Sequence, residues 1–104
     1  MAMKEEWVRV DAYCVSSSEE KSYRADREEL ATRSLKVFGK YFHSTERCWA
    51  GSEDGEAVVG LNEKGELRAL IHLDPMGIDL LKQNPSEIEF EKALLDYNGM
   101  SFEE

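Results

Sequence analysis

The chain has 104 residues and a formal net charge of -9, from 13 basic and 22 acidic side chains. A chain of this length forms one domain around one core. Its negative charge repels nucleic-acid phosphates and anionic lipid, and no apolar run approaches the roughly 20 residues that span a bilayer. We therefore expect a single cytoplasmic domain over residues 1–104, with 1–3 as start residues from cloning and 100–104 as a tail.

The first predicted element is a strand over Glu6–Val15, where apolar and polar side chains alternate. The polar stretch Glu19–Ala25 fits a loop or a frayed helical start. Asp26, followed three residues later by Glu29, predicts the start of a helix. Apolar residues then recur at three- and four-residue spacing as far as Phe42. This pattern predicts an amphipathic helix of about four turns with its aromatic side chains in the core.

Two similar turn signals, Ser52–Gly55 and Asn62–Gly65, predict a three-stranded antiparallel meander from Trp49 to Leu73. The register follows if the first residue of each turn pairs with the Glu after the glycine. The expected pairs are Ser52/Glu56, Trp49/Val59, Arg47/Leu61, Leu61/Leu67, Val59/Ala69 and Ala57/Ile71.

This register assigns one face of the meander to the core, because a slip of one residue would invert the faces. The opposite face is mixed and is assigned neither to the core nor to solvent. Gly60, in the middle of its strand, indicates room for a neighbouring side chain or the close approach of a backbone or a ligand. The expected core face consists of Trp49, Ala57, Val59, Leu61, Leu67, Ala69, Ile71 and Leu73.

Two helices are predicted after the meander. Asp74-Pro75 starts a short helix that ends near Asn84, since Asp caps well and Pro suits the first turn. The capping box Ser86-x-x-Glu89 starts a second helix that ends at Tyr97. The predicted fold is therefore α+β: an antiparallel sheet of the N-terminal strand and the meander, packed on the amphipathic helix, with two C-terminal helices.

The sequence offers no catalytic constellation. Cys48 and His72 share a predicted face, but the expected register separates them by about 16 Å, against about 3 Å for a hydrogen bond. Glu56 and His72 are expected to form a cross-strand pair. The two cysteines lack the paired spacing of a zinc site, and no phosphate-binding loop or nucleophile elbow is present. We expect no catalytic residue, no metal and no cofactor.

The charge distribution indicates a protein partner. Residues 53–104 hold four basic and 13 acidic side chains, so this half carries the whole net charge. The last helix mixes carboxylates with aromatic side chains, a composition typical of a surface that binds a basic protein. We expect a non-enzymatic protein that inhibits or neutralises a basic partner, of the immunity-protein, phage-inhibitor or chaperone type. The expected contact residues are Glu87, Glu89, Phe90, Glu91, Asp96 and Tyr97.

Two alternatives stay open. The mixed face of the meander could bind a small molecule or carry out catalysis, with Glu56, Arg68 and His72 as the residues concerned and Arg68 as the binder of an anionic group. A helix covering that face would remove this alternative. The protein could instead be a structural homo-oligomer, such as a dimer, that pairs through its first strand or an edge of the meander.

Overall fold

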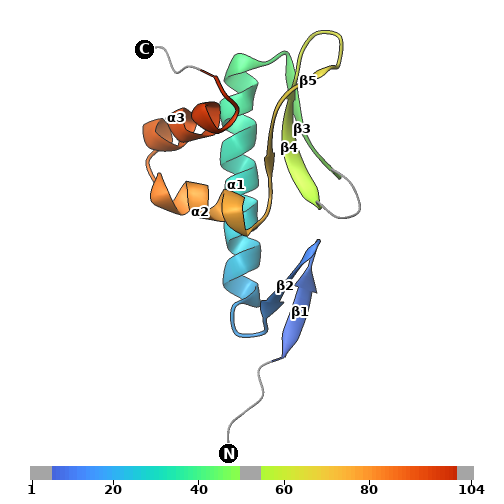
Figure 1. Ribbon diagram of the computed structural model, residues 1–104, viewed down its shortest axis with the longest axis vertical. Helices are drawn as coiled ribbons and strands as arrows, with labels where there is room; N and C mark the ends of the chain where they lie inside the picture. Colours follow the sequence, from blue (N-terminus) through green and yellow to red (C-terminus); the bar gives the residue numbers. More distant parts are fainter. Residues whose placement is uncertain (1–5, 50–54, 101–104) are drawn as a thin grey trace, which may run out of the picture.

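The computed structural model describes residues 6–49 and 55–100 and has the α+β fold expected from the sequence (Figure 1). Within these residues the chain forms two antiparallel sheets, one of two strands and one of three, and three helices. The strands are β1 (Trp7–Val10), β2 (Tyr13–Ser16), β3 (Ser44–Trp49), β4 (Glu56–Leu61) and β5 (Leu67–His72). The helices are α1 (Glu20–Tyr41), α2 (Pro75–Gln83) and α3 (Glu87–Tyr97).

Helix α1 is the central element of the fold. The three-stranded sheet lies on one side of α1, and α2 and α3 lie on the other (Figure 1). Its Leu30 and Phe38 are fully buried in the core that these layers share. The helix begins at Glu20, six residues before the expected start at Asp26. Arg24 pairs with Glu20 one turn away, and Asp26 pairs with Lys82 of α2 instead of capping α1.

The N-terminal strand expected over Glu6–Val15 is a hairpin of two short strands, which form a sheet of their own. The chain reverses at Asp11-Ala12, where Asp11 adopts a positive φ of 58°. Asp tolerates this left-handed conformation better than most residues, but Asp-Ala is a weaker turn signal than Asp-Gly. The regular alternation of apolar and polar side chains therefore gave no sign of the turn. The prediction that this segment joins the sheet of the meander is wrong.

The predicted register of the second hairpin, between β4 and β5, is confirmed at the turn and is wrong beyond the turn. The Asn62 N–H donates to the Glu66 carbonyl at 3.0 Å, and Leu61 faces Leu67 as expected. Arg68 is then an extra residue on β5, a β-bulge that shifts the remaining pairs by one. The observed pairs are Gly60/Ala69, Val59/Leu70, Val58/Ile71 and Ala57/His72, in place of Val59/Ala69 and Ala57/Ile71.

The first hairpin has a longer connection than expected. Trp49 faces Glu56 and Arg47 faces Val58, so the expected pairs Trp49/Val59 and Arg47/Leu61 are wrong. Ser52 and its turn lie outside the described residues. The two shifts exchange the faces of β4: Val58 joins Ala69, Ile71 and Leu73 against α1, whereas Ala57, Val59 and Leu61 line the opposite face. Trp49, expected in the core, is 57% exposed.

The C-terminal helices are capped as predicted. The Asp74 carboxylate accepts a hydrogen bond from the Gly77 N–H at 2.8 Å at the start of α2, and the Ser86 hydroxyl accepts one from the Glu89 N–H at 3.1 Å at the start of α3. At the end of α3, the Asn98 side chain accepts from the Leu70 N–H at 2.9 Å. This bond joins the outer edge of β5 to α3.

Candidate functional site

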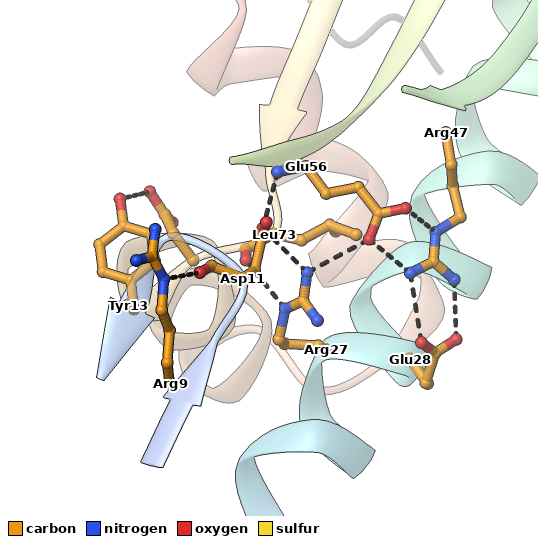
Figure 2. Close-up of polar contacts among 9 residues, drawn as sticks. Arg9, Asp11, Tyr13, Arg27, Glu28, Arg47, Glu56 and Leu73 are labelled. Carbon is orange, nitrogen blue, oxygen red and sulfur yellow. Dashed lines mark hydrogen bonds and ion pairs between the residues drawn. The ribbon is translucent and has the colours of Figure 1, made fainter. Parts of the chain in front are cut away.

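A partly buried cluster of charged side chains joins the β1–β2 turn, α1 and the meander (Figure 2). The Arg27 guanidinium donates to Asp11 at 3.1 Å, to Glu56 at 3.2 Å and to the Leu73 carbonyl at 3.2 Å. Asp11 also accepts from the Glu56 backbone N–H at 2.7 Å. Arg47 extends the cluster by donating to both oxygens of Glu56, at 2.9 and 2.8 Å.

This cluster has the character of a structural ion-pair network. The second edge of the Arg47 guanidinium binds both oxygens of Glu28, at 2.7 and 3.2 Å. Hydrogen bonds to Glu56 and Glu28 raise the pKa of Arg47, and the bond from Arg47 lowers the pKa of Glu28. Buried charges need such partners. Because the two guanidinium groups are occupied by carboxylates of the same chain, neither is free to take an anionic ligand.

The structure does not assemble the three residues of the ligand-face alternative. Glu56 belongs to the cluster on the α1 side of the sheet, so the expected Glu56/His72 pair is wrong. Arg68 is the extra residue of the bulge, and its guanidinium lies 3.7 Å from the Glu66 carboxylate. His72 faces Ala57 on the opposite side of the sheet, which we call the open face of the meander.

The open face holds a shallow recess of about 460 Å³, and no described helix covers it. The condition that would remove the ligand-binding alternative is therefore not met. Cys48, Ala57 and His72 form one row across the three strands. The expected 16 Å between Cys48 and His72 is thus wrong: two strand spacings make about 10 Å. The recess is lined by Glu46, Cys48, Ala57, Val59, Leu61, Gly65, Leu67, Leu70 and His72.

Half of the acidic residues expected to bind a partner attach α3 to α1 instead. Glu87 pairs with Lys36 at 3.0 Å, and Glu91 pairs with Lys40 at 2.6 Å. The Tyr41 hydroxyl also donates to Glu91 at 2.8 Å. The bonds from Lys36 and Lys40 lower the pKa of Glu87 and Glu91, respectively, and the bond to Glu91 raises the pKa of both Lys40 and Tyr41.

The other expected contact residues are divided between the core and the surface. Phe90 is only 1% exposed, and the Arg33 guanidinium lies 5.2 Å from the centre of its ring. Glu89, Asp96 and Tyr97 are exposed. Ile88, which the sequence analysis did not select, is 72% exposed. A helical projection alone does not identify it, because at about 100° per residue Ile88 lies only about 20° from the buried Leu95.

A groove between α1 and α2 was also missed. It has a volume of about 200 Å³ and carries Glu19 and Asp26 from the α1 side and Asp79 from α2, with Lys82 as its basic residue. Asp26 and Lys82 pair at 3.2 Å. No short sequence motif joins these residues, since they come from two helices about 50 positions apart. The groove adds to the negative surface of the protein.

Three further criteria do not identify a function for the described residues: metal-ligand clusters, membrane-spanning helices and similarity to known proteins. No three His, Cys, Asp or Glu side chains within residues 6–49 and 55–100 are grouped so that they could hold a metal ion. None of the three described helices is long and apolar enough to cross a bilayer. Comparisons of the chain with protein-family models, with curated proteins and with solved structures found no match.

Proposed function

We propose that the protein is a non-enzymatic binding protein that occupies a basic surface of a partner protein and thereby inhibits or neutralises it. The observation that carries this proposal is the excess of carboxylates over basic side chains among the described charged groups that form no ion pair. Arg24, Arg27, Arg47 and Arg68 all hold ion pairs with carboxylates of the same chain. Lys36, Lys40 and Lys82 do so too.

The unpaired carboxylates outnumber the described basic side chains without an ion pair, which are Arg9, Lys21, Arg33, Lys64 and Lys92. Apart from the helix cap Asp74, eight described carboxylates form no ion pair with another described residue. A surface of this kind accelerates association with a cationic partner and repels anionic ones. These carboxylates are Glu6, Glu19, Glu29, Glu46, Glu63, Asp79, Glu89 and Asp96, which lie at the surface.

The outward side of α3 is the part of this surface that best suits a protein contact. Glu89 and Asp96 lie there, with the exposed apolar side chains of Ile88 and Tyr97 on either side of them. Apolar anchors within a polar rim provide most of the energy at protein interfaces, and the surrounding charges provide specificity. This surface retains Glu89, Asp96 and Tyr97 of the residues expected from the sequence and adds Ile88. It omits Glu87, Phe90 and Glu91.

A pull-down from a lysate of the native host tests the proposal. We expect the immobilised protein to retain a basic protein at about 50 mM salt and release it at about 500 mM, because salt screens exposed charges. The double variant Glu89→Lys with Asp96→Lys should lose the partner. The control is the double variant Glu29→Lys with Glu63→Lys, which changes the net charge by the same amount but at α1 and the β4–β5 turn. This control should retain the partner.

Two results would contradict the proposal. One is the absence of any stoichiometric basic partner at low salt. The other is equal loss of the partner in both double variants, which would indicate that only the total charge matters and that α3 forms no specific contact.

A further inference from the structure

The meander has two outer edges, and within the described residues only one of them is protected. At the β5 edge, the Asn98 side chain accepts a hydrogen bond from the Leu70 N–H at 2.9 Å, and the bulge at Arg68 interrupts the strand. No described strand lies beside the β3 edge, and β3 has six residues in an unbroken register. Bulges, covering groups and short strands protect a sheet edge from pairing with another chain. The β3 edge has none of these among the described residues and is open to a further strand.

The strand register shows which backbone groups of β3 point outward. The Leu73 N–H donates to the Glu56 carbonyl at 2.9 Å, so the backbone of Glu56 bonds towards β5. Successive residues of a strand bond to opposite sides, so Ala57 bonds towards β3. The same alternation places the Leu70 N–H on the outer side of β5, as observed. On β3, it directs the N–H and C=O groups of every second residue away from the sheet. These residues are Thr45, Arg47 and Trp49.

The side chains along the β3 edge are mainly acidic and aromatic. Glu46, on the open-face side, forms no ion pair with a described residue. Glu28 of α1 lies on the other side, where Arg47 binds it, and its side chain is 63% exposed. Arg47 is the one basic residue of β3, and Glu56 binds it too. Trp49 is exposed at the end of the strand, and aromatic side chains are common anchors of interfaces. The edge therefore suits a strand with a basic residue opposite Glu46 and an apolar residue near Trp49.

A second copy of the chain is a poor match for this edge. Two copies of β3 can pair about a two-fold axis only if one residue lies opposite its own equivalent, because facing side chains share one side of the sheet. The two registers that pair five of the six residues centre on Glu46 and on Arg47, so each places like charges opposite one another. The net charge of -9 on each chain adds to the repulsion. Charge therefore favours a basic strand from a different protein.

We propose that the β3 edge is a strand-addition site for an extended, basic segment of another protein. The segment pairs with the outward backbone groups of β3 and converts the meander into a four-stranded sheet. Its backbone bonds provide binding that depends little on sequence, and a lysine or arginine opposite Glu46 provides specificity. The sheet and α3 lie on opposite sides of α1 (Figure 1), so this site does not depend on the basic partner proposed for α3.

A synthetic peptide tests the proposal. The probe is a seven-residue peptide with blocked ends, in which valine and threonine alternate around one central lysine. We expect a dissociation constant of about 0.1–1 mM, because a short flexible peptide loses conformational freedom when it pairs. In NMR spectra of the labelled protein, the amide signals of Thr45, Arg47 and Trp49 should shift, and hydrogen exchange at these amides should slow. The amides of Leu70 and His72, at the protected edge, should not change.

Matched peptides and variants separate the backbone bonds from the charge. N-methylation of two adjacent peptide residues blocks both edges of the peptide and should weaken binding at least tenfold. Replacing the central lysine of the peptide with glutamate should weaken binding roughly two- to fivefold. In Glu46→Lys this preference for lysine should be lost. Glu63→Lys changes the net charge equally at the β4–β5 turn and should keep the preference, and circular dichroism checks that both variants fold.

Four results would overturn the proposal. The first is the absence of shifts at the three outward amides of β3 at about 2 mM peptide. The second is equal binding of the N-methylated peptide, and the third is a preference for lysine that survives Glu46→Lys. The fourth is a mass of twice 11.9 kDa for the free protein with slow exchange at the same amides, which would assign the edge to a second copy. None of these results would affect the binding of a basic partner to α3.

Discussion

At the scale of single residues, the close contact between Gly60 and Phe42 shows how side-chain size limits the fold. A Cβ atom on Gly60 would lie 2.5 Å from Cδ2 and 2.9 Å from Cγ of the Phe42 ring. The ring therefore occupies the space that any larger residue at position 60 would need. The sequence indicated a close approach at Gly60, and the structure identifies the group that approaches it as a core side chain, not a ligand.

We expect Gly60→Ala to lower the free energy of unfolding by about 1–3 kcal/mol, the usual cost of forcing an extra group into a packed core. Gly39→Ala is the matched control, because a Cβ atom there would meet nothing within 4 Å and position 39 lies within α1. It should raise the same free energy by about 0.4–1 kcal/mol, since alanine favours the helix. Urea unfolding measures both. Equal effects of the two substitutions would contradict this account of Gly60.

At the scale of elements, the features that could be predicted from the sequence are those that depend on residues close together in the chain. The caps at Asp74 and Ser86 lie within three residues of the N–H groups they accept from, so a short motif was enough to find them. The strand register depends on features without such a motif: the bulge at Arg68 and the length of the connection after Trp49. These two shifts moved Val59 and Leu61 from the α1 side of the sheet to the open face, where Val59 is still buried.

The candidate surfaces follow the same division. The acidic character of α3 could be predicted from its composition. The sequence could not show that Glu87 and Glu91 form ion pairs with Lys36 and Lys40, which lie about 50 residues earlier. Only the tertiary structure shows which carboxylates are used within the fold and which remain exposed.

The attachment of α3 to α1 should depend on pH. Lys40 holds the pKa of Glu91 below the ordinary carboxyl value of 4.5. A carboxyl with a lowered pKa in the folded state stabilises that state above the unfolded pKa, and this stabilisation is lost as the pH falls through the folded pKa. We therefore expect amide hydrogen exchange in α3 to accelerate, relative to α1, as the pH falls below about 4.5.

Substitution of Glu91 separates this effect from general acid unfolding. Glu91→Gln should show less protection of α3 at pH 7 and a weaker dependence on pH. Glu89→Gln removes an exposed carboxyl of the same helix that forms no ion pair with a described residue, and should retain the wild-type profile. The same loss of pH dependence in both variants would contradict a specific role for Glu91.

At the scale of the whole molecule, the β1–β2 hairpin extends the fold along its longest dimension of 57 Å (Figure 1). None of its side chains belongs to the described main apolar core, although Val10 is buried. The cluster of Asp11, Arg27 and Glu56 is the main polar connection between the hairpin and the meander (Figure 2). The Arg27 guanidinium of α1 helps to hold the hairpin in place, together with the Glu56 N–H that donates to Asp11 and the Tyr13 hydroxyl that donates to Asp74.

Arg27→Met should weaken the attachment of the hairpin to the rest of the molecule. Removing one partner of a buried ion pair costs about 3–5 kcal/mol, because the other charge stays buried without compensation, and Asp11 would be that charge. Arg24→Met is the matched control on the same helix, where an exposed pair with Glu20 is worth no more than about 0.5 kcal/mol. In Arg27→Met, hydrogen exchange should accelerate most in β1 and β2, while α1 and β4 keep more of their protection. If protection fell uniformly across the chain, the hairpin and the meander would form one cooperative unit, and the cluster would stabilise the whole fold without specifically holding the hairpin.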